Sequence, residues 1–215
     1  MEHNRHLPGR LPRILLISSG KGDAANETAL LPLLNHLPPA LPCMVQIREK
    51  LLSAGELLTL AFDVSSSNLP KGTLLLINER LDIALLADLD GVHLPENAMP
   101  PDALRAVSKK LLIGCSVHST LSATKAEKAG ADYLLFGPVY DTPSKRPFGA
   151  PQGTAKLAEL CRSTSLPVFA IGGITPANAA ACIDAGAYGI GGISLFSNPV
   201  TLSATIEQCY RIINS

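Results

Sequence analysis

The chain has 215 residues, of which 47% are hydrophobic and 17% are charged. Its 18 basic and 18 acidic residues cancel, so the basic footprint of a nucleic-acid binder is absent. No apolar run is long enough to cross a bilayer, no secretion signal precedes the first apolar run, and the five cysteines lack metal-ligand spacing. We therefore expect a cytoplasmic protein with a large core, with neither nucleic acid nor membrane as a partner.

Eight short apolar runs rich in Val, Ile and Leu recur along the chain, without the strict alternation of a sheet that has one wet face. They predict buried parallel strands. In chain order the strands are expected at 13–18, 44–48, 73–78, 91–94, 111–115, 133–137, 168–172 and 189–194.

The segments between these runs carry helix signals. Ser53 and Glu56 match a capping box, and a cap residue before a proline predicts helix starts at Thr175 and at Asn198. The repeat of strand and helix predicts an α/β fold, a parallel (β/α)8 barrel of one domain. The barrel is expected to span residues 13–215 after an extension over 1–12, and an open doubly wound sheet is the alternative.

Strand two ends in a polar segment, and the site of such a barrel lies where its strands end. Alternation along the strand sends Gln46, Arg48 and Lys50 to one side, the mouth of the barrel. Two cations and an amide suit a phosphate or diphosphate, although a solvated strand end explains these residues equally well. Asn78 and Glu79 close strand three in the same manner.

Glycine-rich segments end the last two strands. Gly172 and Gly173 follow strand seven, and Gly192, Ile193 and Ser194 end strand eight. Phosphate sites in barrels are often built from these two loops, because glycine lets backbone N–H groups approach an anion. We favour a phosphate site here over close packing alone.

Two further loops carry reactive side chains. The loop after strand six places Thr142, Ser144 and Lys145 within four residues, a set that can bind phosphate. His118 follows strand five, and an imidazole can transfer a proton near neutral pH. A structural role for His118 is an equal alternative, and His93, inside strand four, is expected to be structural.

Taken together, the strand ends over residues 13–197 resemble the family of the thiamine phosphate synthases and their relatives, the TenI-type thiazole tautomerases. The landmarks are Gln-Ile-Arg-Glu-Lys at 46–50, Asp-Gly-Val-His-Leu at 90–94, Ser-Val-His at 116–118, Thr-Pro-Ser-Lys at 142–145 and Ala-Ile-Gly-Gly at 170–173.

The resemblance to the synthases implies roles for several residues. Those matching Arg48, Lys50, Asn78 and Lys145 hold the diphosphate of a hydroxymethylpyrimidine, and hydroxyls like those of Thr142 and Ser144 contact a thiazole phosphate. The synthases also bind Mg²⁺ through two aspartates. This chain has Glu79 at the first of those positions and Ala98 at the second, with Glu96 as a displaced candidate.

The resemblance to the tautomerases rests on those same departures, together with Leu94-Pro95 and the Ser-Val-His-Ser run. In that group the histidine matching His118 is the proposed proton shuttle, and no cofactor is required. We therefore predict a thiazole tautomerase that binds a small phosphorylated thiazole. A Mg²⁺-dependent thiamine phosphate synthase, which also binds pyrimidine diphosphate, stands second, a non-catalytic sensor of thiazole or thiamine phosphate stands third, and a homo-oligomer is left open.

Overall fold

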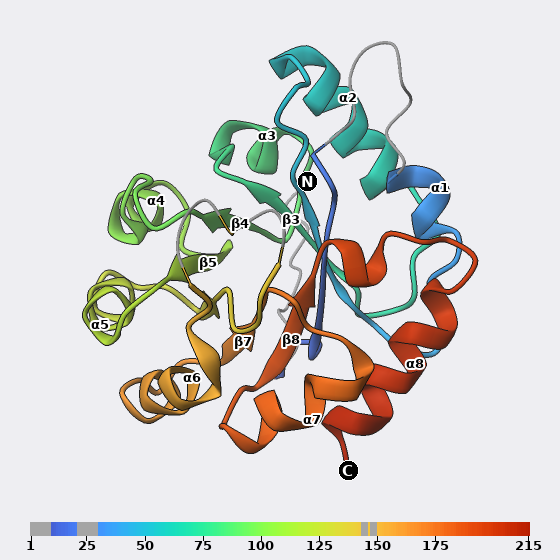
Figure 1. Cartoon of the computed structure of the whole chain (residues 1–215). Helices are drawn as coiled ribbons and strands as arrows, with labels where there is room; N and C mark the ends of the chain where they lie inside the picture. Colours follow the sequence, from blue (N-terminus) through green and yellow to red (C-terminus); the bar gives the residue numbers. More distant parts are fainter. Residues whose placement is uncertain (1–9, 21–29, 143–145, 147–149) are drawn as a thin grey trace.

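A computed structural model describes residues 10–20, 30–142, 146 and 150–215 of the chain. Eight parallel strands pair in chain order and β8 pairs with β1, so the sheet closes into a barrel (Figure 1). The predicted (β/α)8 barrel is confirmed. The strands are β1 (Ile14–Ile17), β2 (Met44–Ile47), β3 (Leu74–Asn78), β4 (Gly91–Leu94), β5 (Leu112–Val117), β6 (Tyr133–Phe136), β7 (Val168–Ala170) and β8 (Gly189–Gly192).

The α-helices form a ring around the strands, and α8 lies between α7 and α1 (Figure 1). No helix in the described part of the chain is both long and apolar enough to cross a membrane. The helices are α1 (Leu30–Leu34), α2 (Ala54–Ser65), α3 (Leu81–Leu86), α4 (Pro101–Val107), α5 (Thr120–Lys128), α6 (Gly153–Arg162), α7 (Pro176–Asp184), the 3-10 helix η2 (Ser194–Phe196) and α8 (Leu202–Ile213).

Several predicted strand ends were wrong: β5 runs on to Val117 rather than stopping at 115, and β7 ends at Ala170 rather than at 172. Two further differences have a clear physical reason. β8 ends at Gly192 rather than at Ser194, because the chain turns tightly into η2 and packs buried Phe196 against Gly192. The helix expected after Asn198 begins at Leu202 instead, since Asn198 Oδ1 accepts the amide of Val200 at 3.0 Å and stabilises a turn there.

Other local predictions are confirmed. The Glu56 carboxylate accepts the Ser53 amide at 2.8 Å while Ser53 Oγ accepts the Glu56 amide, so α2 begins with a capping box. Helix α7 begins at Pro176, directly after Thr175. These signals are local, so the sequence alone carries them.

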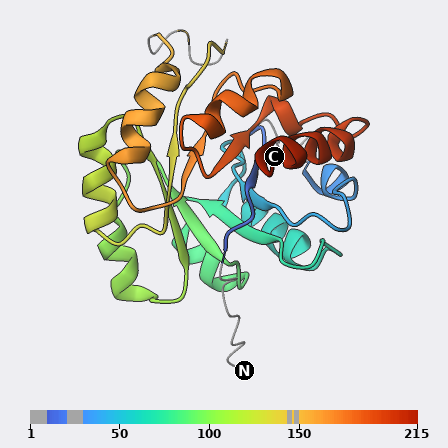
Figure 2. The same ribbon diagram turned by 90° about the horizontal axis from the view of Figure 1, so that it is seen from below.

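Alternate strand residues face two different cores. Outward-facing residues pack beneath the helices that surround the strands (Figure 2). Inward-facing residues fill the barrel, and an edge-to-face series of Tyr133, Phe169 and Tyr188, with ring centroids 5.5 Å apart, crosses it. At the amino ends of the strands, Arg13 donates to the Tyr188 and Ile213 carbonyls at 2.6 Å. Side chains therefore fill the amino end of the barrel, and a site is expected at its carboxyl end.

Candidate functional site

Polar side chains of β2 and β3 meet at the carboxyl end of the barrel. Gln46 Nε2 donates to Asn78 Oδ1 at 3.0 Å, and Asn78 Nδ2 donates to the Glu79 carboxylate at 2.9 Å. Gln46 is buried, Asn78 is half-buried and Glu79 is exposed. We call these three residues the amide row. It brings together side chains that the sequence assigned to two separate strand ends.

The Glu79 carboxylate sets the direction of the amide row. A carboxylate only accepts, so Asn78 turns its N–H towards Glu79 and its oxygen towards Gln46. Gln46 therefore donates its side-chain N–H to the Asn78 oxygen. Its own oxygen, Oε1, is buried and has no hydrogen-bond partner within the described residues. Folded proteins seldom leave such an acceptor unpaired. The amide row therefore holds a buried acceptor that no described residue pairs.

The backbone at Glu79 is also unusual. Its φ of 61° lies in the left-handed region, which a glutamate seldom adopts. The Glu79 amide donates to the His93 carbonyl at 3.0 Å, which ties the turn after β3 to β4. Outliers of this kind concentrate at functional sites.

Arg48 extends the mouth above β2. Its backbone amide donates to Ser18 Oγ at 2.8 Å, and Gly20 lies so close that an added Cβ would stand 3.2 Å from Arg48 Nη1. Burial, together with the charge of Arg48, lowers the pKa of His93 to about 3. The half-buried guanidinium therefore lies near the barrel interior, where the sequence predicted it.

The other residues predicted to bind phosphate differ in their exposure, and two of them lie outside the described part of the chain. Lys50 is exposed beyond Arg48, and Thr142 is half-buried at the end of the described part of its loop. Ser144 and Lys145 lie outside the described residues, so their assignment stays a prediction.

The two glycine-rich loops lie against different neighbours. A Cβ at Gly172 would stand 2.5 Å from Pro138 Cβ, and one at Gly173 would stand 2.4 Å from the Asp141 carbonyl oxygen. Both glycines have positive φ, so close packing of the β7–α7 loop on the β6–α6 loop already requires them. Phosphate binding by these glycines stays a prediction.

The end of β8 is the other glycine-rich segment. Gly192 is buried, Ile193 is half-buried and Ser194 is exposed at the start of η2. The shorter strand moves Ile193 and Ser194 out of β8 and into the connection above it. Their predicted contact with a phosphate is not tested by this placement.

Tyr133, His93 and Ser116 form a second hydrogen-bonded set, which we call the histidine row. His93 Nδ1 lies 3.0 Å from the Tyr133 hydroxyl, and Nε2 lies 2.9 Å from Ser116 Oγ. Tyr133 and His93 are buried, whereas Ser116 is half-buried. The row thus runs from the barrel core to the mouth.

Glycine at position 114 makes this row geometrically feasible. His93, Gly114 and Tyr133 are register neighbours on β4, β5 and β6. A Cβ at Gly114 would stand 2.0 Å from Tyr133 Cζ, so only a bare backbone lets the tyrosine ring cross β5 to reach His93.

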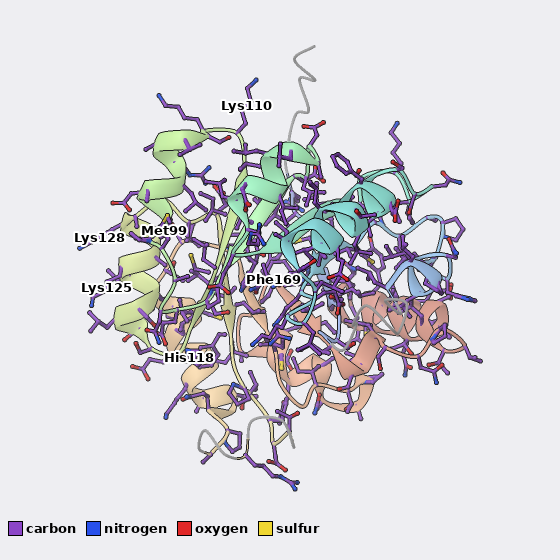
Figure 3. The ribbon with its side chains drawn as sticks, turned by 90° about the horizontal axis from the view of Figure 1, so that it is seen from above. Met99, Lys110, His118, Lys125, Lys128 and Phe169 are labelled. Carbon is purple, nitrogen blue, oxygen red and sulfur yellow. The ribbon has the colours of Figure 1, made fainter. Side chains whose placement is uncertain are left out.

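His118 lies at the outer rim, beside the helix that carries Lys125 and Lys128 and far from Phe169 in the barrel centre (Figure 3). Its Nδ1 atom is 2.7 Å from Glu96 Oε2, and its side chain is 45% exposed. Burial acts to raise the pKa of Glu96, but hydrogen bonds from Ser122 and His118 outweigh it and lower that pKa. His118 therefore has a charged partner that orients its ring.

A hollow of about 430 Å³ opens between the β4–α4 connection and α5. Glu96 and Ser116 both line it, together with Met99, Ser122 and Lys125. The hollow joins the outer end of the histidine row to the carboxylate partner of His118.

Glu96 and Ser116 were not predicted in these roles. Glu96 was considered as a metal ligand, but its carboxylate contacts His118, which lies 22 residues along the chain. Ser116 enters the sequence prediction only as part of the Ser-Val-His motif. The alternation that places Gln46 and Arg48 on one side also places Gly114 and Ser116 on one side of β5, but the predicted strand stops at 115 and so leaves Ser116 out.

The donors for a metal are few. No three His, Cys, Asp or Glu side chains within the described ranges come together as a group that could hold an ion. Glu79 contributes one exposed carboxylate, and the side chain of Ala98 has no donor atom. Mg²⁺ is commonly held by one or two carboxylates plus substrate phosphates. Glu79 therefore fits an ion whose other ligands come mainly from a bound diphosphate.

Comparison with known proteins gives one consistent match. The family described as thiamine monophosphate synthase matches residues 16–196. "Putative thiamine-phosphate synthase 2" of Aquifex aeolicus is 42% identical over 86% of this chain and 98% of that protein. "Thiamine-phosphate synthase" of Methanoculleus marisnigri is 43% identical over 70% of this chain and 72% of that protein. The solved thiamine phosphate pyrophosphorylase from Pyrococcus furiosus has a TM-score of 0.79 at 27% identity, covering 94% of this chain and 96% of that one.

Proposed function

Because the chain belongs to the thiamine monophosphate synthase family, we propose that it is a thiamine-phosphate synthase, which joins hydroxymethylpyrimidine diphosphate to a thiazole phosphate. This corrects the order of the hypotheses drawn from sequence. The comparisons do not support the tautomerase placed first, and they favour the transferase placed second.

The free acceptor of Gln46 is the observation that carries the proposal. The pyrimidine of thiamine bears an exocyclic amino group, and an N–H of that group would satisfy Gln46 Oε1. A site that holds a buried acceptor discriminates strongly against an analogue without the matching donor. Gln46 would thus select an aminopyrimidine.

Arg48 and Lys50 would act on the diphosphate. In the reaction the thiazole nitrogen forms a bond to the pyrimidine methylene carbon, the bond from that carbon to oxygen breaks, and diphosphate leaves with the electron pair. Negative charge therefore grows on the leaving oxygen. The Arg48 guanidinium would stabilise it, with Lys50 as a second cation and Asn78 beside them; the effect of the Arg48 charge on His93 supports this role.

Glu79 would hold Mg²⁺ together with the diphosphate. When bound, the ion would neutralise part of the charge on the leaving group. The thiazole phosphate would bind at Gly172, Gly173 and the segment from Gly192 to Ser194, where backbone amides lie at a barrel rim suited to anions. Thr142 and Ser144 would complete that site, while Lys145 would join Arg48 and Lys50 at the diphosphate.

The test is formation of thiamine phosphate by the purified protein from both substrates with Mg²⁺. We expect turnover, and we expect Arg48→Gln to lower kcat/KM by about 10²-fold to 10³-fold, the usual cost of losing a charge-stabilising donor. Arg162→Gln is the matched control, because Arg162 ends α6 at the opposite end of the barrel. Absence of product at any Mg²⁺ concentration would refute the proposal.

In the structure, the His118–Glu96 pair favours the tautomerase. A carboxylate bonded to Nδ1 leaves Nε2 available to accept a proton. The same preparation is therefore given the thiazole carboxylate tautomer without metal. Conversion that is lost in His118→Ala would favour the tautomerase. Binding of thiazole phosphate or thiamine phosphate without any turnover would favour the non-catalytic sensor.

A further inference from the structure

The neutral His93 ring can carry its proton on Nδ1 or on Nε2, and the surroundings of Tyr133 determine which nitrogen carries it. Among the described residues, His93 Nδ1 is the only hydrogen-bond partner of the Tyr133 hydroxyl, and the ring is fully buried. If Nδ1 carried the proton, the Tyr133 oxygen would accept it and its own O–H would have no acceptor. A buried donor without an acceptor is costly, so the tyrosine donates to an unprotonated Nδ1.

The protonation of His93 then follows. The ring is neutral, because burial and the charge of Arg48 lower the pKa of His93 to about 3. A neutral ring with a bare Nδ1 carries its proton on Nε2. Nε2 lies 2.9 Å from Ser116 Oγ, so the histidine donates and the serine accepts.

The direction of this hydrogen bond determines whether the Ser116 hydroxyl faces the mouth of the barrel as a donor or as an acceptor. The Ser116 oxygen already accepts a hydrogen bond from His93, so its O–H is still available to donate one. No second residue within the described chain accepts a hydrogen bond from this O–H. Ser116 is half-buried and lines the hollow beside β5. The hydroxyl therefore points a donor out of the barrel core.

We propose that His93 is a positioning residue that, held by Tyr133, makes the Ser116 hydroxyl an obligatory hydrogen-bond donor to an acceptor atom of the substrate. The substrate assignment rests on the function proposed above. The row would also exclude nucleophilic use of Ser116, because a protonated Nε2 cannot take the serine proton. A row of serine, histidine and tyrosine at these distances otherwise resembles an activated nucleophile.

The tautomer is measured directly in protein labelled with ¹⁵N-histidine. Nitrogen NMR distinguishes a protonated ring nitrogen from a bare one, and the His93→Gln spectrum assigns the His93 signals. We expect Nε2 protonated and Nδ1 bare, unchanged from about pH 5 to about pH 8. A proton on Nδ1, or a doubly protonated ring in that range, would overturn the proposal. If His93→Gln fails to fold, the shift caused at Nε2 by Ser116→Ala assigns the signals instead.

Kinetics test the use of the donor. Ser116→Ala should lower kcat/KM about tenfold or more, as expected for a lost bond to a charged or strongly polar group. His93→Gln can still give Ser116 an N–H and should retain more activity than His93→Leu, while a merely structural role would affect both according to stability alone. Ser116→Ala with wild-type kinetics would overturn the proposal. Absence of turnover in the wild-type protein would instead refute the proposed synthase and leave the NMR result to decide the tautomer.

Discussion

The amide row and the histidine row end at the same mouth but are anchored in opposite ways. Glu79, an exposed carboxylate, orients Asn78 and Gln46 from the rim inwards, and the row delivers an acceptor. Tyr133, a fully buried hydroxyl, orients His93 from the core outwards, and that row delivers a donor at Ser116. Changes to Tyr133 and His93, the buried part of the second row, should therefore mainly affect stability, whereas loss of Glu79, the exposed anchor of the first row, should mainly affect binding.

The largest expected effect is on the passage of Tyr133 across β5. Gly114→Ala would place a methyl group 2.0 Å from Tyr133 Cζ, and Phe169 already packs edge-to-face against the same ring. We expect the free energy of unfolding to fall by about 3 kcal/mol, measured by urea denaturation. Gly55→Ala is the control, because its Cβ would meet nothing within 4 Å and the change should stay within about 1 kcal/mol. Equal effects would contradict the account of the row.

The next effect compares the two histidines. His93→Leu leaves the buried Tyr133 hydroxyl without an acceptor and should cost about 2 kcal/mol of unfolding free energy. His118→Leu breaks an exposed pair and should change stability by about 0.5 kcal/mol or less. Both are measured by chemical denaturation at neutral pH. A larger loss at His118 would show that the rim, not the core, carries the stabilising contacts.

The pH dependence of stability sharpens the same contrast. The pKa of His93 is about 3 in the fold and returns to about 6.5 when unfolding exposes the ring. Between these values the unfolded chain binds a proton that the folded chain does not. Stability due to neutral His93 is therefore complete above about pH 6.5 and is lost as pH falls towards 3, by at most about 1.4 kcal/mol per pH unit.

The variant His93→Gln isolates this contribution. Its unfolding free energy, followed by urea titration from about pH 7 down to about pH 4.5, should decline less steeply than that of the wild type. Carboxyl groups titrate mainly below that window and affect both proteins alike. Parallel curves would mean that His93 is not held neutral.

The smallest effect on stability is expected in the amide row. Glu79→Ala should change the unfolding free energy by about 0.5 kcal/mol or less, because the side chain is exposed. It should nevertheless weaken binding of hydroxymethylpyrimidine without phosphate or metal several-fold, about 1 kcal/mol by calorimetry, since Gln46 loses its fixed orientation. Using the unphosphorylated compound separates this role from metal binding.

An exposed glutamate elsewhere serves as the control for that variant. Glu159 lies on α6, so Glu159→Ala should leave pyrimidine binding unchanged. Equal binding by the wild type and Glu79→Ala would show that the carboxylate does not orient Gln46.

The barrel and the polar strand ends could be predicted because their signals are local. Buried parallel strands are continuous apolar runs, and alternation along β2 was enough to place Gln46 and Arg48 at the mouth. The end of β8 could not be predicted, because it depends on the packing of Phe196 over Gly192.

The two pairs of site residues that sequence reasoning missed depend on long-range geometry. Glu96 lies in the loop after β4, and only the fold of that loop brings its carboxylate to His118, which lies 22 residues later in the chain. Tyr133 reaches His93 only because the register sets both beside Gly114. Neither contact has a spacing signal in the sequence, and register between strands is what a single chain reveals least.

The proposed function requires this mouth to bind an aminopyrimidine diphosphate and to transfer its pyrimidine to a thiazole phosphate. The most direct measurement is a paired turnover assay of the purified protein, with both substrates and Mg²⁺ in one arm and the thiazole carboxylate tautomer alone in the other. We expect thiamine phosphate in the first arm, in greatly reduced amount with Arg48→Gln. Metal-independent conversion in the second arm with no product in the first would contradict it.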